Sequence, residues 1–136
     1  MKSMADATVD GIWQRALEET AQPDRAGDLA LRVVLRAHGL IMSGGLERLF
    51  EVLSPADVVL AAGGYVYLNL VRVSEIVVEA SLVPADSVNG VRWMELNNQY
   101  SAEIPRDEVL VERLKRLASV APHAFAPLDR GDPQAE

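Results

Sequence analysis

The sequence predicts an all-α protein: a single compact multi-helix domain of about six to seven short helices. Its 136 residues, 49% of them hydrophobic, are enough to bury one continuous core. Apolar residues recur mainly at spacings of three and four, and proline and glycine separate the periodic segments. We expect the helical domain to cover residues 1–126, followed by a flexible polar tail over residues 127–136.

The first helix is expected from Ala5 to Ala21, because apolar residues form one stripe along it. A second helix should begin at Asp28, whose carboxylate can cap the exposed amides, and should end near His38 and Gly39. Residues 40–45 should then turn the chain at paired glycines, and a third, short helix should cover residues 46–53. The stripe of the first helix consists of Val9, Ile12, Trp13, Ala16 and Leu17.

The clearest start signal is Ser54-Pro55, a serine N-cap followed by proline at the first helical position. This fourth helix should end near Asn69, a residue that tolerates the left-handed cap conformation. Gly63 and Gly64 inside it should each cost about 1 kcal/mol relative to alanine. Such a pair indicates the close approach of a neighbouring helix.

The second half of the chain is expected to hold two further helices and a segment that is harder to assign. Residues 71–82 favour a helix, although their adjacent β-branched residues leave a strand open. Between residues 87 and 100 the expected anchors are Val91, Met94 and Leu96, with an end at Asn97 and Asn98. Residues after 104–107 should form the last helix, which Pro122 ends.

Composition restricts the classes of function. The chain has no cysteine, which suits a cytoplasmic protein, and it has neither a secretory signal nor the roughly 20-residue apolar run of a membrane span. The net charge of −7 argues against direct binding to nucleic acid, so a charge-guided partner should be basic. The plainer interpretation is that this charge only keeps the protein soluble.

No catalytic, cofactor or metal motif is recognisable, so we expect a protein that is not an enzyme and needs no cofactor. His38 and His123 lie far apart in sequence, without the spacing of two metal ligands. We expect His38 to complement the carbonyl end of its helix, and His123 to be a capping or packing residue. Ser43 lacks the glycine two places earlier that a nucleophile elbow needs, and neither glycine pair belongs to a phosphate loop.

Acidic residues recur at a spacing of four, which places each pair on one side of a helix. A row of such pairs can imitate the spaced charges of a phosphate backbone. The alternative is an ordinary solvated surface, because Arg48, Arg72 and Arg116 stand close enough in sequence to neutralise their neighbours. The pairs are Asp6 and Asp10, Glu47 and Glu51, Glu75 and Glu79, and Glu108 and Glu112.

Three segments resemble a bacterial family of small acidic helical proteins, a domain of unknown function that includes a dimeric DNA-mimic protein. They are residues 42–46 (Met-Ser-Gly-Gly-Leu), residues 54–55, and residues 64–70 (Gly-Tyr-Val-Tyr-Leu-Asn-Leu). Residues 121–126 look like the C-terminal ending of that family, so the resemblance covers about residues 30–125. The family carries Asn-Gly-Gly where this chain has Ser43-Gly44-Gly45.

The resemblance implies a homodimer whose acidic surface binds a basic protein, such as a transcription factor, in place of DNA. With the net charge, it leads to the hypothesis of a non-enzymatic acidic interaction module. The candidate partner-binding residues are Glu47, Glu51, Glu75, Glu79, Glu108 and Glu112. One alternative is an immunity or antitoxin protein that binds a toxin. Another is an enzyme in which His38, Glu75 and Glu79 converge in a cleft.

Overall fold

The computed structural model describes residues 4–18, 25–84 and 90–128. These residues form a single compact domain of six α-helices and one short 3₁₀ helix, with no strand among them, which confirms the all-α prediction. The elements are α1 (Met4–Leu17), α2 (Ala26–Val52), α3 (Pro55–Tyr67), α4 (Val71–Ser81), α5 (Gly90–Glu103), α6 (Glu108–Val120) and η2 (Pro122–Ala124).

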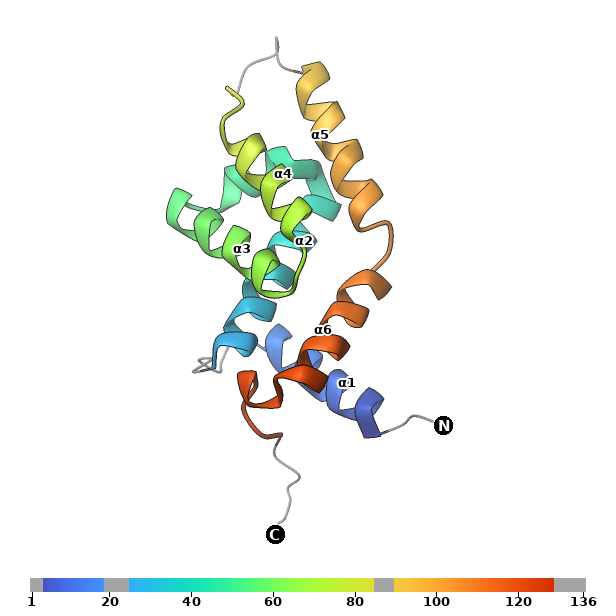
Figure 1. Ribbon diagram of the computed structural model, residues 1–136. Helices are drawn as coiled ribbons and strands as arrows, with labels where there is room; N and C mark the ends of the chain where they lie inside the picture. The colour runs from blue at the N-terminus through green and yellow to red at the C-terminus, as the bar shows by residue number, and fades with distance from the viewer. Residues whose placement is uncertain (1–3, 19–24, 85–89, 129–136) are drawn as a thin grey trace.

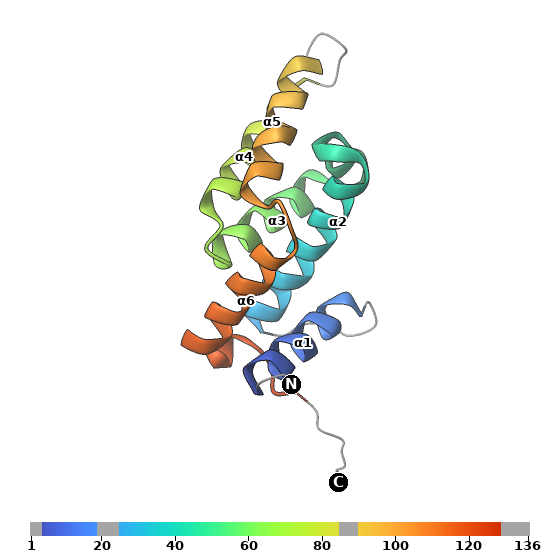
Figure 2. The same cartoon turned by 90° about the vertical axis from the view of Figure 1, so that its right-hand side faces the viewer.

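The long helix α2 is the centre of the fold. It packs against α1 and η2 at one end of the molecule and against α3, α4 and α5 towards the other (Figures 1 and 2). Among the described residues, α2 is the one helix whose length and apolar composition would allow it to cross a membrane. Core helices of soluble proteins often have the same length and composition. The buried residues Leu31, Val34 and Ala37 of α2 belong to the one hydrophobic core.

Several predicted helix ends are confirmed. Ser54 caps α3 by accepting a hydrogen bond from the Asp57 amide at 3.2 Å, and Pro55 is the first helical residue. Asn69 has a φ of 64°, the left-handed conformation expected after this helix. Residues 71–81 are helical, so the strand alternative for this segment was wrong.

The predicted end of the second helix at His38 and Gly39 is wrong. The helix continues beyond Gly39, and the non-helical angles inside α2 are confined to Gly44 and Gly45. The predicted break at the paired glycines is therefore confirmed, as is the helix that follows it, which ends at Val52 with Leu53 as its C-cap.

Gly45 has a φ of 79°, which favours glycine. The break frees the Leu46 amide, and the Asn97 side chain of α5 accepts its hydrogen bond at 2.7 Å. A residue distant in sequence therefore caps the second part of α2.

Helix α5 does not end at Asn97 and Asn98, contrary to the prediction, but continues to Glu103. The Asn97 side chain bonds to Leu46 and Glu47 of α2 and does not cap its own helix. Of the expected anchors, only Leu96 is buried, while Val91 and Met94 are exposed. The buried stripe of α5 is Trp93, Leu96 and Tyr100.

Asp28 does not cap α2, contrary to the prediction. It lies inside the helix and is buried, and its carboxylate accepts hydrogen bonds from Arg15 of α1 and from the Ala126 amide, both at 2.8 Å. Arg15 also donates to the Ala126 carbonyl at 2.9 Å, so one ion pair joins α1, α2 and the segment after η2.

The predicted end of the first helix at Ala21 lies outside the described residues, and within them α1 ends at Leu17. Of the predicted tail over residues 127–136, only Pro127 and Leu128 are described: the Pro127 carbonyl accepts a hydrogen bond from Arg15 at 3.3 Å, and Leu128 packs against the core.

Candidate interaction surface

The outward side of α3 carries no charged residue. Its inward residues pack on α2 and α4, and Asp57, the single charged residue of the helix, is half-buried near its first turn. Val59 and Leu60 are 70% and 51% exposed. We call the exposed residues of this helix the α3 face: Pro55, Ala56, Val59, Leu60, Gly63, Val66 and Tyr67.

The two adjacent glycines of α3 have different surroundings. A Cβ on Gly64 would lie 2.8 Å from a methyl carbon of Val33 and 2.9 Å from the Ala30 carbonyl oxygen, so α2 requires glycine there. This confirms the expected close helix approach for Gly64. A Cβ on Gly63 would meet no atom within 4 Å. Nothing within the described chain therefore explains a glycine at the centre of the α3 face.

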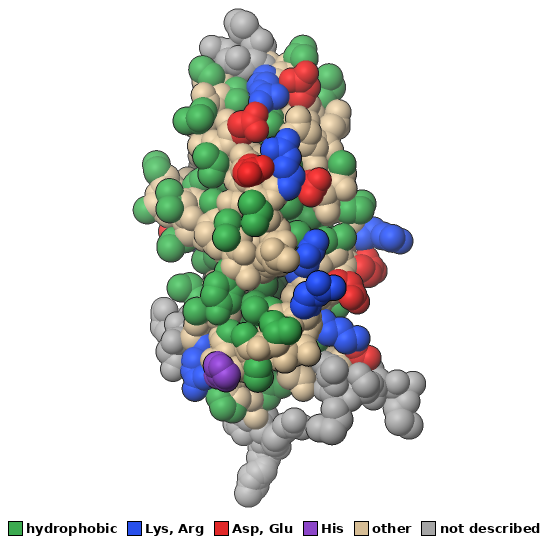
Figure 3. Space-filling model, viewed as in Figure 1, with side chains coloured by type: hydrophobic (Ala, Val, Ile, Leu, Met, Phe, Trp, Pro, Cys, Tyr) green, Lys and Arg blue, Asp and Glu red, His purple; other side chains and the backbone are tan. Residues whose placement is uncertain are grey.

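Helix α4, which packs against α3, adds exposed apolar residues on its own outer side. Val71, Val78 and Leu82, its C-cap, are 49%, 49% and 77% exposed. Their spacing of seven and four places them on one stripe, and the exposed Glu75, four residues after Val71 and three before Val78, lies on the same stripe. Hydrophobic side chains gather at the left-hand edge of Figure 3, where α3 lies in Figure 1, and beside the column of charged side chains.

That column is a network of ion pairs between α4 and α5 (Figure 3). Arg72 lies 3.4 Å from Glu75 and 3.9 Å from Glu79 of its own helix. Arg92 of α5 reaches across to Glu79 and pairs with Glu95 at 3.3 Å. The structure thus brings Glu75 and Glu79 together, but each is paired with at least one arginine, and the network of three glutamates and two arginines keeps a single negative charge.

The other candidate glutamates lie elsewhere. Glu47 accepts a hydrogen bond from Asn97 at 2.8 Å, and Glu51 lies 3.7 Å from Arg48. Asn97, which bonds to Glu47, and Arg92, which pairs with Glu79, are five residues apart in α5. This spacing is about 140° around a helix, so Glu47 and Glu79 lie on different sides of α5. Glu108 and Glu112 belong to α6, near the opposite end of the molecule (Figure 1). The six candidate glutamates therefore do not share one surface.

His38 is not at a helix end, which corrects the prediction. It is buried inside α2, where its Nδ1 is 2.8 Å from the Tyr100 hydroxyl and its Nε2 is 3.2 Å from the Asp107 carboxylate. The Tyr100 hydroxyl is in turn 2.6 Å from that of Tyr65. This chain of hydrogen bonds joins α2, α3, α5 and the start of α6. His38 does not meet Glu75 and Glu79, which pair with arginines instead, so the convergence required by the enzyme alternative does not occur.

This buried chain predicts a loss of stability in alkali. Burial raises the pKa of both Tyr65 and Tyr100 above the ordinary value of 10.0. Above about pH 10 the unfolded chain therefore releases protons that the folded protein retains, and the free energy of unfolding should fall as pH rises. Urea denaturation at increasing pH measures this fall. The fall in the free energy of unfolding should be smaller in Tyr100→Phe. Tyr67 lies outside the chain of hydrogen bonds, so Tyr67→Phe should behave as wild type. Identical pH profiles for the two variants would contradict the role given to the buried tyrosines.

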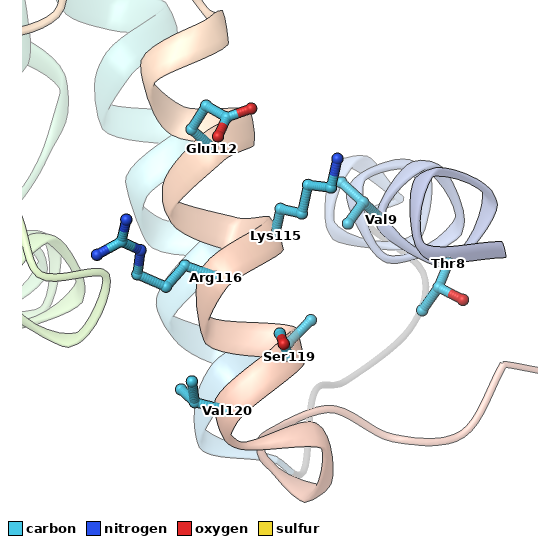
Figure 4. Close-up of a pocket in the computed structure, with 8 residues that line it drawn as sticks. Thr8, Val9, Glu112, Lys115, Arg116, Ser119 and Val120 are labelled. Atoms are coloured by element: carbon cyan, nitrogen blue, oxygen red, sulfur yellow. The ribbon is translucent and has the colours of Figure 1, made fainter. Parts of the chain in front are cut away.

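A hollow of about 540 Å³ lies between α1 and α6. Figure 4 shows Lys115 pointing from α6 towards α1, while Arg116 points to the other side of α6. Lys115 is 3.1 Å from Asp6, whose hydrogen bond raises the pKa of that lysine. The charged groups of the hollow thus diverge, and the described residues contain no group of three or more side chains able to hold a metal ion.

The α3 face was not identified from sequence, although a signal was present. Residues 58–62 are Val-Val-Leu-Ala-Ala, so this helix is apolar on its outward as well as its inward side. Such a helix is usually buried on all sides. No family model, no curated protein and no solved structure matches this chain.

Proposed function

We propose that this protein is a non-enzymatic protein-interaction module that binds its partner through the α3 face. The observation that carries the proposal is the absence of charge from every exposed residue of α3. Surface helices normally turn charged or polar residues outward, and contiguous exposed apolar patches mark contact sites. A protein partner would remove this surface from water.

A protein is a better occupant of the α3 face than a membrane. Helices that lie on membranes carry lysine or arginine beside their apolar side, which attracts anionic lipid. The one charged residue of α3 is Asp57, and the nearest charges on α4 alternate in sign, as Arg72 and Glu75 show. The surroundings of the face therefore supply no attraction for anionic lipid.

Binding of a basic regulator or a toxin by the acidic residues is a second proposal, favoured by the net charge of −7. It is weaker because Arg72 and Arg92 occupy the carboxylates of Glu75, Glu79 and Glu95. The two proposals differ in salt dependence. Exposed charges are screened beyond about 8 Å at physiological ionic strength, whereas contact between apolar surfaces persists in high salt.

The test compares two variants that place the same charge on equally exposed valines. Val59 on the α3 face and Val120 on α6 are 70% and 74% exposed, so arginine should be tolerated by the fold at both. Quantitative capture from native lysate at high salt should lose partners with Val59→Arg and keep them with Val120→Arg. If both arginine variants captured the same amount of partner, and the double variant Glu75→Lys/Glu79→Lys captured less, the binding surface would be the acidic residues and not the α3 face.

A further inference from the structure

We infer that a hollow between α1, α6 and the segment after η2 is a binding site for a small apolar carboxylate, such as a fatty acid. No residue of α3 lines this hollow, so the site lies apart from the α3 face and goes beyond the proposed function. Three features of the described residues lead to the inference: the apolar walls of the hollow, the contacts that hold those walls, and an arginine at its opening.

The hollow has a volume of about 530 Å³ and mostly apolar walls. It forms where α1, the end of α6, η2 and the following segment come together, at the lower end of the molecule in Figure 1. Ile12, Phe125 and Leu128 contribute large hydrophobic side chains, with the small side chain of Ala118 among them. Pockets for small organic molecules measure about 300–1,000 Å³ and have mainly hydrophobic linings. The hollow therefore fits one small apolar ligand.

Two glycines bring the walls of the hollow together. A Cβ on Gly11 of α1 would lie 2.7 Å from a methyl carbon of Leu128, and a Cβ on Gly27 of α2 would lie 2.6 Å from a carbonyl oxygen of η2. Because neither position carries a side chain, η2 and the segment after it pack closely on both helices. The ion pair of Arg15 and Asp28 bonds to the same segment. Walls that are already in place do not have to be ordered by the ligand, which favours binding.

The opening of the hollow is basic, although the chain carries a net charge of −7. None of the described residues that line it is acidic, whereas the neighbouring hollow between α1 and α6 includes Glu112. Arg25 and His123 line it and are at least partly exposed, and Arg25 donates a hydrogen bond to the His123 carbonyl at 3.0 Å. Figure 3 shows a histidine and a basic side chain together near this end, among hydrophobic side chains. The opening therefore attracts an anionic group.

Arg25 selects the headgroup of the ligand. The described residues give its guanidinium one carbonyl oxygen as an acceptor and no carboxylate, and a guanidinium has more N–H donors than this contact uses. The remaining donors form a fork that matches the two oxygens of a carboxylate. A phosphate monoester would bring a charge of about −1.5 to −2 to this single arginine. A monocarboxylate with an apolar chain therefore suits both the opening and the walls.

Octanoate and octanol test the headgroup, because they share an apolar chain and differ in charge. Isothermal titration calorimetry with the full chain near neutral pH should show saturable binding of octanoate and weaker binding of octanol. Arg25→Gln keeps a donor for the His123 carbonyl but loses the charge. It should weaken octanoate binding about 10-fold or more and leave octanol binding unchanged. Arg36→Gln is the matched control and should bind both ligands as wild type does, because Arg36 of α2 is exposed and does not line the hollow.

The position of the ligand is tested separately. Octanoate should shift the amide NMR signals of Thr8, Ala118 and Ala126, which line the hollow, and leave that of Gly63 on the α3 face unchanged. Ala118→Phe places a large side chain in the hollow and should abolish the binding of both ligands. Circular dichroism of each variant checks that the helices remain folded.

Three results would overturn the inference. Absence of saturable octanoate binding at millimolar concentration would show that the hollow is not a site for this class of ligand. Amide shifts that gather on the α3 face would place the ligand elsewhere. Equal weakening of octanoate and octanol binding by Arg25→Gln would show that Arg25 shapes the hollow and does not bind the carboxylate. The capture experiment with Val59→Arg is independent of all three, because Val59 does not line the hollow.

Discussion

Replacement of Asp28 by alanine is expected to lower the free energy of unfolding by about 2–4 kcal/mol. The change leaves the Arg15 guanidinium without its carboxylate and the Ala126 amide without an acceptor. Arg15 still donates a hydrogen bond to the Ala126 carbonyl, and its side chain is about a quarter exposed. The expected loss in the free energy of unfolding is therefore smaller than for a fully buried ion pair. Urea denaturation followed by circular dichroism measures it.

Two further variants serve as controls for this measurement. Asp28→Asn retains an oxygen acceptor but loses the charge, so its loss should be smaller than that of Asp28→Ala. Glu103→Ala removes an exposed carboxylate at the end of α5 and should change stability by no more than about 0.5 kcal/mol. A loss below about 1 kcal/mol for Asp28→Ala would show that the ion pair does not hold α1 and the C-terminal segment on α2.

Alanine at the adjacent glycines of α3 should have opposite effects. Gly64→Ala pushes a Cβ against the Ala30 carbonyl oxygen of α2, and backbone cannot rotate away, so we expect a loss of about 1–3 kcal/mol. Gly63→Ala meets open space and removes the conformational cost of a helical glycine, a gain of about 0.5–1 kcal/mol. Denaturation at a concentration low enough to exclude association measures both.

Each glycine variant is the control for the other, because they make the same chemical change one residue apart. Equal losses would mean that packing within one chain requires both glycines. A gain at Gly63 together with a loss at Gly64 would show that packing within one chain requires only Gly64.

The interaction surface shows how a pattern can be visible in sequence and still be misassigned. The acidic residues at a spacing of four were evident, but sequence could not show that Arg92, on another helix, would reach Glu79. Conversely, the apolar run over residues 58–62 is consistent with a helix buried on all sides. Only the packed structure shows that Val59 and Leu60 remain exposed.

Sequence by itself determined the helical class and the ends set by local chemistry. Ser54-Pro55 starts α3 and Asn69 ends it, because capping and left-handed backbone depend on residues next to one another. The tertiary structure alone decided the roles of His38, Asn97 and Asp28. Each looked like a helix-end residue, yet each sits inside a helix where its polar group bonds to a distant element. The physical reason is that a polar side chain removed from water, fully for His38 and Asp28 and partly for Asn97, needs a hydrogen-bond partner, and that partner comes from whatever the fold packs beside it.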